Sequence, residues 1–272
     1  MAILRHARRN GSWYIEVNAD SGPSDLIGRL TELGFRKDGG SYWKLCPPIV
    51  GSPTELLNRT IDHCGPDVEK VACRLLSPPP DQTQVTAAPD LEKLLWPAKV
   101  VGSGIQTFIV AIKPRWAKHL LGTGVNDNDL YGTDMELAFN LEGVYYRSAR
   151  QPGPTDRSRV VWYVKDDPKF DWSGRLIACS HVECVELGAA KVLFKKNERF
   201  GVYGFQDVLR TVGGDHSKDL MAIRFSNTER LASPMSYEQA KSLLSDHVPW
   251  NNFQSPLEIP EEDFLRIYRF PA

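Results

Sequence analysis

The segment Thr107-Phe108-Ile109-Val110-Ala111-Ile112-Lys113-Pro114-Arg115-Trp116-Ala117 decides the fold of the larger part of this chain of 272 residues. Its apolar and β-branched beginning predicts a strongly apolar strand over residues 107–112. The residues that follow predict a helix over residues 115–121. Strands separated by loops begin at this point of the sequence.

The same strand signal recurs downstream of this segment. Strands are predicted for residues 144–148, 160–164, 175–187 and 218–226, and helices for residues 189–196, 236–244 and 261–268. An order dominated by strands favours a small, partly open barrel with peripheral helices. We therefore predict one β-rich domain over residues 107–272.

The upstream residues predict a small α/β domain over residues 1–76. Strands are predicted for residues 13–17, 41–45 and 68–76, and helices for residues 2–10, 24–33 and 54–64. The chain then turns to Pro78-Pro79-Pro80 and polar residues, which have little to bury. We predict a linker over residues 77–106, exposed as far as residue 90 and with a short helix at 91–96.

Composition and charge restrict the classes of function. The chain is 42% hydrophobic and 25% charged, as folded proteins are, and its net charge is -1. This balance excludes a broadly basic nucleic-acid coat, so any nucleic-acid binding has to be local. The five cysteines are never spaced Cys-x-x-Cys, and we predict no cofactor and no metal. No apolar run reaches the length of a membrane span and the first residues lack a signal-peptide core, so we predict a cytoplasmic location.

Five short motifs follow one another in the second domain. They are Ile112-Lys113-Pro114-Arg115-Trp116-Ala117, Glu142-Gly143-Val144-Tyr145-Tyr146-Arg147-Ser148, Trp162-Tyr163-Val164, Ala178-Cys179-Ser180-His181-Val182-Glu183 and Gly201-Val202-Tyr203. These motifs resemble the PUA-like superfamily, in particular its ASCH-type and EVE-type domains. The resemblance covers residues 107–272 and rests on the order of these short motifs. It implies an α+β protein with a PUA-like β-pseudobarrel whose cleft takes a base, a modified base or an RNA segment.

The side chains of these motifs suit such a ligand, because flat rings stack on bases and polar groups read base edges. The predicted ligand-binding residues are Tyr146, Arg147, Ser148, Trp162, Ser180, His181, Trp250, Asn252, Gln254 and Ser255. Strand alternation allows only one of Tyr145 and Tyr146 to face the core. Trp162 on an apolar strand is equally typical of a core residue, and His181 of a structural histidine.

Two further groups of residues border this predicted cleft. Lys113, Arg150, Arg157 and Arg159 are predicted to contact phosphates, the arginines from a mobile basic loop. Residues 248–256 concentrate aromatic and amide side chains, which predicts a cleft wall or, alternatively, a simple turn that covers the barrel.

Catalysis is an alternative that the sequence weakens. ASCH-type domains commonly carry a Gly-x-Lys-x-x-Glu signature, and some hydrolyse modified nucleosides with its Lys and Glu. The matching region reads Gly122-Thr123-Gly124-Val125-Asn126-Asp127 and lacks the lysine. Lys113 with Glu142 or Glu183 could replace that pair, although no spacing requires it.

Residues 1–45 resemble the C-terminal half of a GNAT acetyltransferase in the order of helix, strand, helix, Leu33-Gly34-Phe35 and strand. Such enzymes hold acetyl-CoA with a loop of the type Arg-x-x-Gly-x-Gly/Ala before a helix. Here Arg8-Arg9-Asn10-Gly11-Ser12-Trp13 ends in tryptophan and leads into a strand. We therefore do not expect this chain alone to be an acetyltransferase, and we predict that this domain contacts a protein partner.

The predicted function is binding of RNA or a modified nucleotide in the PUA-like cleft. The protein would be accessory to an acetyltransferase or to a toxin-antitoxin type system, with no membrane as partner. The alternatives are a hydrolase of a modified nucleoside and a protein-interaction or regulatory module.

Overall fold

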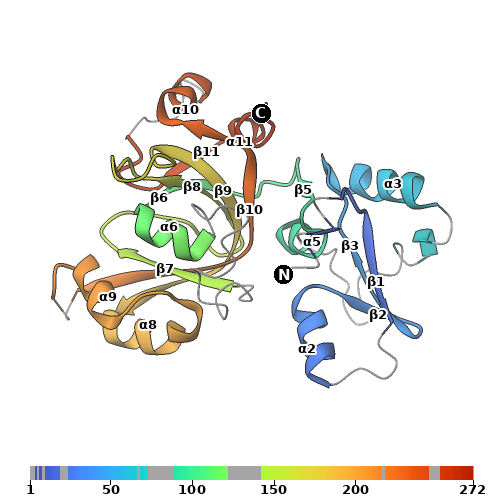
Figure 1. The fold of residues 1–272 in the computed structure, drawn as a ribbon, viewed down its shortest axis with the longest axis horizontal. Helices are drawn as coiled ribbons and strands as arrows, with labels where there is room; N and C mark the ends of the chain where they lie inside the picture. Colours follow the sequence, from blue (N-terminus) through green and yellow to red (C-terminus); the bar gives the residue numbers. More distant parts are fainter. Residues whose placement is uncertain are drawn as a thin grey trace. The chain divides into compact units, whose positions relative to one another are not determined.

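The chain forms two compact units, Met1–Ile105 and Gln106–Ala272. The computed structural model describes residues 4, 6–7, 10–18, 24–65, 68–70, 72, 88–121, 142–215, 218–244 and 252–271 (Figure 1). Both units combine helices with sheets, so the predicted α+β class is confirmed. No helix in these ranges is long and apolar enough to cross a membrane.

A three-stranded antiparallel sheet begins the first unit. Its strands are β1 (Tyr14–Asn18), β2 (Arg36–Asp38) and β3 (Ser41–Leu45), in the order β1-β3-β2. Helix α2 (Ser24–Glu32) covers one face through a cluster that includes Leu30, Phe35 and Tyr42. The strands and the helix predicted around residues 13–17, 24–33 and 41–45 are confirmed.

Helix α3 (Pro53–Cys64) begins at a capping box in which Ser52 and Glu55 satisfy each other's backbone amides. It packs with α5 (Ala88–Leu94) in a second cluster. Beside them, β4 (Val50–Gly51) pairs in parallel with β5 (Lys99–Val100). The first unit therefore contains residues 88–105, the second half of the predicted linker, whereas residues 77–87 lie outside the described residues.

The strand predicted for residues 68–76 is wrong over its described part. Residues 68–70 and 72 are helical. Val68 and Ala72 are four residues apart and both are buried, which is the spacing of one face of a helix.

A lysine lies in the interior of the first unit. Lys44 is 2% exposed, and its Nζ donates a hydrogen bond of 2.8 Å to the carbonyl oxygen of Leu94. Leu94 is the last residue of α5, so its carbonyl has no partner within the helix. Burial lowers the pKa of Lys44 from 10.5 to about 8, and burial raises the pKa of the nearby Cys46 thiol from 9.0 to about 11.

These two groups predict how stability changes with pH. Between pH 8 and 10.5 the unfolded chain holds more protons on Lys44 than the folded chain, so stability rises with pH. Cys46 acts in the opposite direction between pH 9 and 11. The net rise in stability is therefore confined to pH values below about 9. We expect a gain of about 1 kcal/mol between about pH 7 and 9, measured by urea unfolding of the full chain.

Lys44→Met is the control, because it keeps the apolar stem and removes the titration. The second unit contributes equally to both proteins, so the difference between their pH profiles isolates Lys44. Equal profiles in the two proteins would contradict the assignment.

The second unit is built on a six-stranded sheet in the order β11-β6-β8-β9-β10-β7. Its strands are β6 (Thr107–Ile112), β7 (Glu142–Ser148), β8 (Arg159–Val164), β9 (Arg175–Ala189), β10 (Asp219–Ser236) and β11 (Leu257–Ile259). Strands β6 and β8 are parallel, and the other pairs are antiparallel. The hydroxyl of Tyr145 on β7 donates a hydrogen bond of 2.9 Å to the carbonyl of Ala111 on β6, so the sheet curls until these two strands approach each other.

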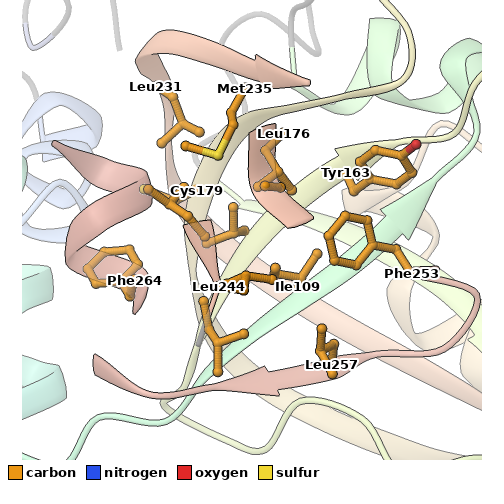
Figure 2. Packing of buried hydrophobic residues seen from close by; sticks show 14 residues of the cluster. Ile109, Tyr163, Leu176, Cys179, Leu231, Met235, Leu244, Phe253, Leu257 and Phe264 are labelled. Atoms are coloured by element: carbon orange, nitrogen blue, oxygen red, sulfur yellow. The ribbon is translucent and has the colours of Figure 1, made fainter. Parts of the chain in front are cut away.

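Each face of the sheet carries its own core. Trp162, Ile223 and Phe225 form the inner cluster, against which α6 (Pro114–Leu121) packs. One outer cluster lies under α10 (Tyr237–Leu243) and α11 (Glu261–Tyr268), and Figure 2 shows its side chains. The other lies under α8 (Ala190–Asn197) and α9 (Phe205–Thr211). Figure 1 shows these two helix pairs at opposite ends of the unit.

The strands and helices predicted for residues 107–268 are confirmed. Strand β10 continues ten residues beyond its predicted end at residue 226, through irregular pairing with β9 around Asn227. The prediction missed α9 and β11 and the short 3-10 helix Glu198–Phe200, which are too short to show a clear period.

Candidate functional site

Strand pairing places part of the predicted site on the inner face of the sheet. Residues paired across neighbouring strands point to the same face. Arg147 pairs with Met221 and Trp162 with Ala178, and both partners belong to the inner cluster. Ser180 follows Ala178 by two residues on β9, so it also points inward. The inner face therefore holds Arg147, Trp162 and Ser180.

The remaining strand residues of the predicted site lie on the outer face. Tyr146 is buried in the cluster under α8 and α9, and its ring meets Tyr203 edge to face at 5.3 Å. Ser148 is half-buried on the same face. Arg159 and His181 pair with each other and are both buried, with the Arg159 guanidinium 4.6 Å from the ring centre of Phe264. The predicted site residues therefore lie on both faces of the sheet and do not line one cleft.

Trp162 is a core residue. It is 0% exposed, and its ring is enclosed edge to face by Tyr145 at 5.5 Å and Phe225 at 5.0 Å. Its Nε1 donates a hydrogen bond of 2.8 Å to Ser180 Oγ, which lies 2.8 Å from Thr228 Oγ1. The stacking role predicted for Trp162 does not fit this position, because no ring face is open to a base.

Arg147 has the environment expected of a binding residue. It is half-buried, and its Nη1 atom is fully buried without a hydrogen-bond partner in the described part of the chain. Burial lowers the pKa of Arg147, an effect that Tyr145 partly opposes. Burial also raises the pKa of Tyr145 to about 12, so this phenol stays neutral and supplies no compensating charge. A buried guanidinium donor without an acceptor is costly, which favours a site for an acceptor from outside the chain.

Gly153 lies against this guanidinium. A Cβ atom at Gly153 would come within 3.1 Å of Arg147 Nη1 and 3.0 Å of Met221 Sδ. Since both atoms belong to long, flexible side chains, a new methyl group would displace them at little cost to the fold. Sequence reasoning missed Gly153 and Met221, because nothing in the sequence indicates that they adjoin Arg147.

Gly153→Ala is therefore expected to change stability by less than about 1 kcal/mol while displacing the Arg147 guanidinium. The affinity of any anionic ligand of Arg147 should fall several-fold, measured by titration beside thermal unfolding. Gly204→Ala is the matched control, because the nearest atom to its new Cβ would be Asp207 Oδ2 at 3.7 Å, an ordinary contact. Unchanged affinity in Gly153→Ala would show that ligands do not use this guanidinium.

The segment at residues 252–255 belongs to the outer face. Phe253 is buried against Tyr163 at 4.8 Å in the cluster under α10 and α11, as Figure 2 shows. Asn252 accepts a hydrogen bond of 2.5 Å from the Tyr237 hydroxyl, while Gln254 is exposed and Ser255 half-buried. This arrangement favours the turn that covers the core over the cleft wall. Trp250 lies outside the described residues.

The predicted phosphate-contact residues differ in exposure. Lys113, Arg150 and Arg157 are exposed, whereas Arg159 is 1% exposed. The loop before β8 is held by hydrogen bonds: Thr155 Oγ1 donates to Gln106 Oε1 at 2.7 Å, and the Val185 amide donates to Asp156 Oδ1 at 2.7 Å. Arg157 itself has a φ of 62° and its amide donates to the Val182 carbonyl at 3.0 Å.

The carboxylates of the catalytic alternative have other partners. Glu142 forms an ion pair with Arg224, and Glu183 accepts a hydrogen bond from Ser226. Ser226 pairs with His181, so this polar group lies on the outer face. Residues 122–127, which match the region of the ASCH signature, lie outside the described residues.

The chain has distant similarity to several solved structures. The chain is similar to the ASCH protein from Zymomonas mobilis, with 14% identity over 61% of this chain and 96% of that one and a TM-score of 0.46. A single-residue variant of that protein matches with 14% identity over 61% and 99% and a TM-score of 0.46. The N-terminal domain of McrB from Staphylothermus marinus matches with 12% identity over 62% and 96% and a TM-score of 0.40. No protein-family model and no curated protein matches the chain.

These similarities are too distant to identify a ligand, so the ligand has to be inferred from the side chains of this chain. The resemblance of residues 1–45 to a GNAT acetyltransferase stays a prediction, as do the absence of a cofactor and the cytoplasmic location.

Proposed function

We propose that the second unit binds RNA or a nucleotide on the inner face of its sheet, with Arg147 holding a phosphate. The observation that carries this proposal is the buried Nη1 atom of Arg147, which has no acceptor among the described residues. An anionic oxygen would complete its hydrogen bonding and compensate its charge. Arginine suits this role because its planar fork matches the geometry of phosphate.

The balance of charge agrees with a local contact of this kind. The net charge is -1, so the whole protein does not attract nucleic acid through a broad positive field. A single desolvated guanidinium instead gains its strength from the low dielectric around it. The ordered motifs that resemble PUA-like proteins favour a nucleotide over other anions.

Titration of the full chain tests the proposal. Fluorescently labelled RNA and DNA oligonucleotides and unlabelled nucleotides would be added at low and at moderate salt. We expect binding of RNA or nucleotides with a shallow salt dependence, because few phosphates are neutralised. Binding of DNA alone would exclude an RNA-specific site, and no affinity for any of these ligands at low salt would remove the proposed function.

Two finer predictions belong with this function. The first unit is proposed to contact a protein partner, and the protein to act beside an acetyltransferase or a toxin-antitoxin type system. Purification of the tagged full chain from its own cells, followed by mass spectrometry, tests both. Recovery of the chain without a stoichiometric partner would contradict them. Hydrolysis is not favoured, because Glu142 and Glu183 are engaged with Arg224 and Ser226.

A further inference from the structure

The loop between β7 and β8 is attached to the sheet unevenly. Its second half is held by hydrogen bonds, beginning with Thr155 Oγ1, which donates to Gln106 Oε1 at 2.7 Å. Residues 152–154, Pro152-Gly153-Pro154, form no hydrogen bond in the described part of the chain. The prolines have no amide hydrogen to donate. We name residues 150–154 the strap; its last three residues rest on the sheet through packing alone.

The strap covers the guanidinium of Arg147. A Cβ atom at Gly153 would come within 3.1 Å of Arg147 Nη1, and this nitrogen is fully buried without an acceptor among the described residues. A phosphate oxygen bonded to Nη1 has to lie about 2.7–3.2 Å from it. The strap occupies that space from the loop side, so a bound phosphate and the strap in this position exclude each other.

The strap is the part of the site that can move. Arg147 stands on β7, which pairs with β10 along its length, whereas residues 152–154 have no hydrogen bond to break. Each proline fixes its own φ and favours an extended residue before it, so the strap moves as a stiff segment. Opening exposes Pro154, which is buried, but it also lets water reach the buried Nη1 donor. These two effects oppose each other, which keeps the open state accessible.

We propose that the strap is a lid on the phosphate site, closed over Arg147 in the absence of ligand and opened before a phosphate oxygen reaches Nη1. This inference rests on the proposed function and adds the regulation of access to its site. The fraction of molecules with an open strap then limits the rate of association. It lowers the apparent affinity by the same factor.

Arginine modification by phenylglyoxal tests the closed strap without any nucleotide. The reagent bonds both terminal nitrogens of a guanidinium, so it requires access to Nη1. In the wild-type full chain, mass spectrometry should find Arg147 modified clearly more slowly than the exposed Arg175. Pro154→Gly should speed modification of Arg147 about tenfold, as loss of a buried apolar ring does, and leave Arg175 unchanged. Pro168→Gly is the matched control, at an exposed proline in the loop between β8 and β9.

Stopped-flow binding of a fluorescently labelled RNA pentamer to the same proteins tests the role of the lid. Pro154→Gly should bind about tenfold faster than wild-type protein, by the same shift toward the open strap. Thr155→Val is a second variant, which removes the hydrogen bond to Gln106 and should speed binding severalfold. Its control is Thr211→Val, which removes a hydrogen bond to the Val208 carbonyl on α9.

The outcomes separate the lid from the proposed function. If Arg147 of wild-type protein reacts as fast as Arg175, the strap is not closed and the inference is wrong whether or not RNA binds. If Arg147 is protected and Pro154→Gly exposes it, but no protein binds RNA or nucleotides, the proposed function is wrong. If RNA binds equally fast to Pro154→Gly and Pro168→Gly, the function stands and the strap is not a lid.

Discussion

Trp162→Ala is expected to lower the free energy of unfolding of the second unit by about 3–5 kcal/mol. Trp162 is 0% exposed and is the largest of the fully buried side chains, so its truncation leaves a cavity at the centre of the inner face. Tyr145 and Phe225 lose their edge-to-face contacts, and Ser180 Oγ loses its donor.

Urea unfolding of the full chain, followed by circular dichroism, measures this effect. Trp162→Phe should cost less, because a ring remains and the hydrogen bond to Ser180 is worth about 1 kcal/mol. Trp172→Ala is the control at a half-buried tryptophan and should cost clearly less than Trp162→Ala. A loss below about 1 kcal/mol in Trp162→Ala would mean that Trp162 is not a core residue.

Arg147→Met is expected to weaken nucleotide or RNA binding by about 30-fold or more, since breaking a desolvated charge pair costs about 2–5 kcal/mol. Methionine keeps the apolar stem and removes the guanidinium. In the absence of ligand, stability should stay equal or rise slightly, because the substitution removes a buried Nη1 donor that has no acceptor among the described residues.

The combination of lost affinity and kept stability distinguishes binding from a structural role. Isothermal titration calorimetry and thermal unfolding of the same samples measure the two quantities. Arg175→Met is the control at an exposed arginine outside the predicted site and should change affinity far less. A marked loss of stability in Arg147→Met would show that the guanidinium supports the fold instead.

The elements of the second unit follow from the sequence because their signals are local. Strand β6 (Thr107–Ile112) and helix α11 (Glu261–Tyr268) both have the bounds that the sequence predicts. The irregular continuation of β10 past residue 226 depends on its pairing with β9, a contact between distant parts of the chain. The hydrophobic periodicity of one segment does not predict such a contact.

The arrangement of the candidate site also depends on contacts between distant parts of the chain, so the sequence predicts it less well than the strands and helices. Alternation along β7 separates Arg147 from Tyr146 and Ser148, but the sequence does not tell which face is inner. The burial of Trp162 follows from two rings on other strands, Tyr145 and Phe225. The approach of Gly153 to Arg147 and Met221 joins a loop to two paired strands, which no pattern in the sequence specifies.

The position of the phosphate in a complex tests the central claim most directly. A crystal structure of the full chain with a short RNA or a nucleotide would reveal it. The account predicts a phosphate oxygen about 2.7–3.2 Å from Arg147 Nη1, on the inner face of the sheet. A ligand bound on the outer face beside Arg159 or His181, with Arg147 Nη1 still lacking an acceptor, would contradict it.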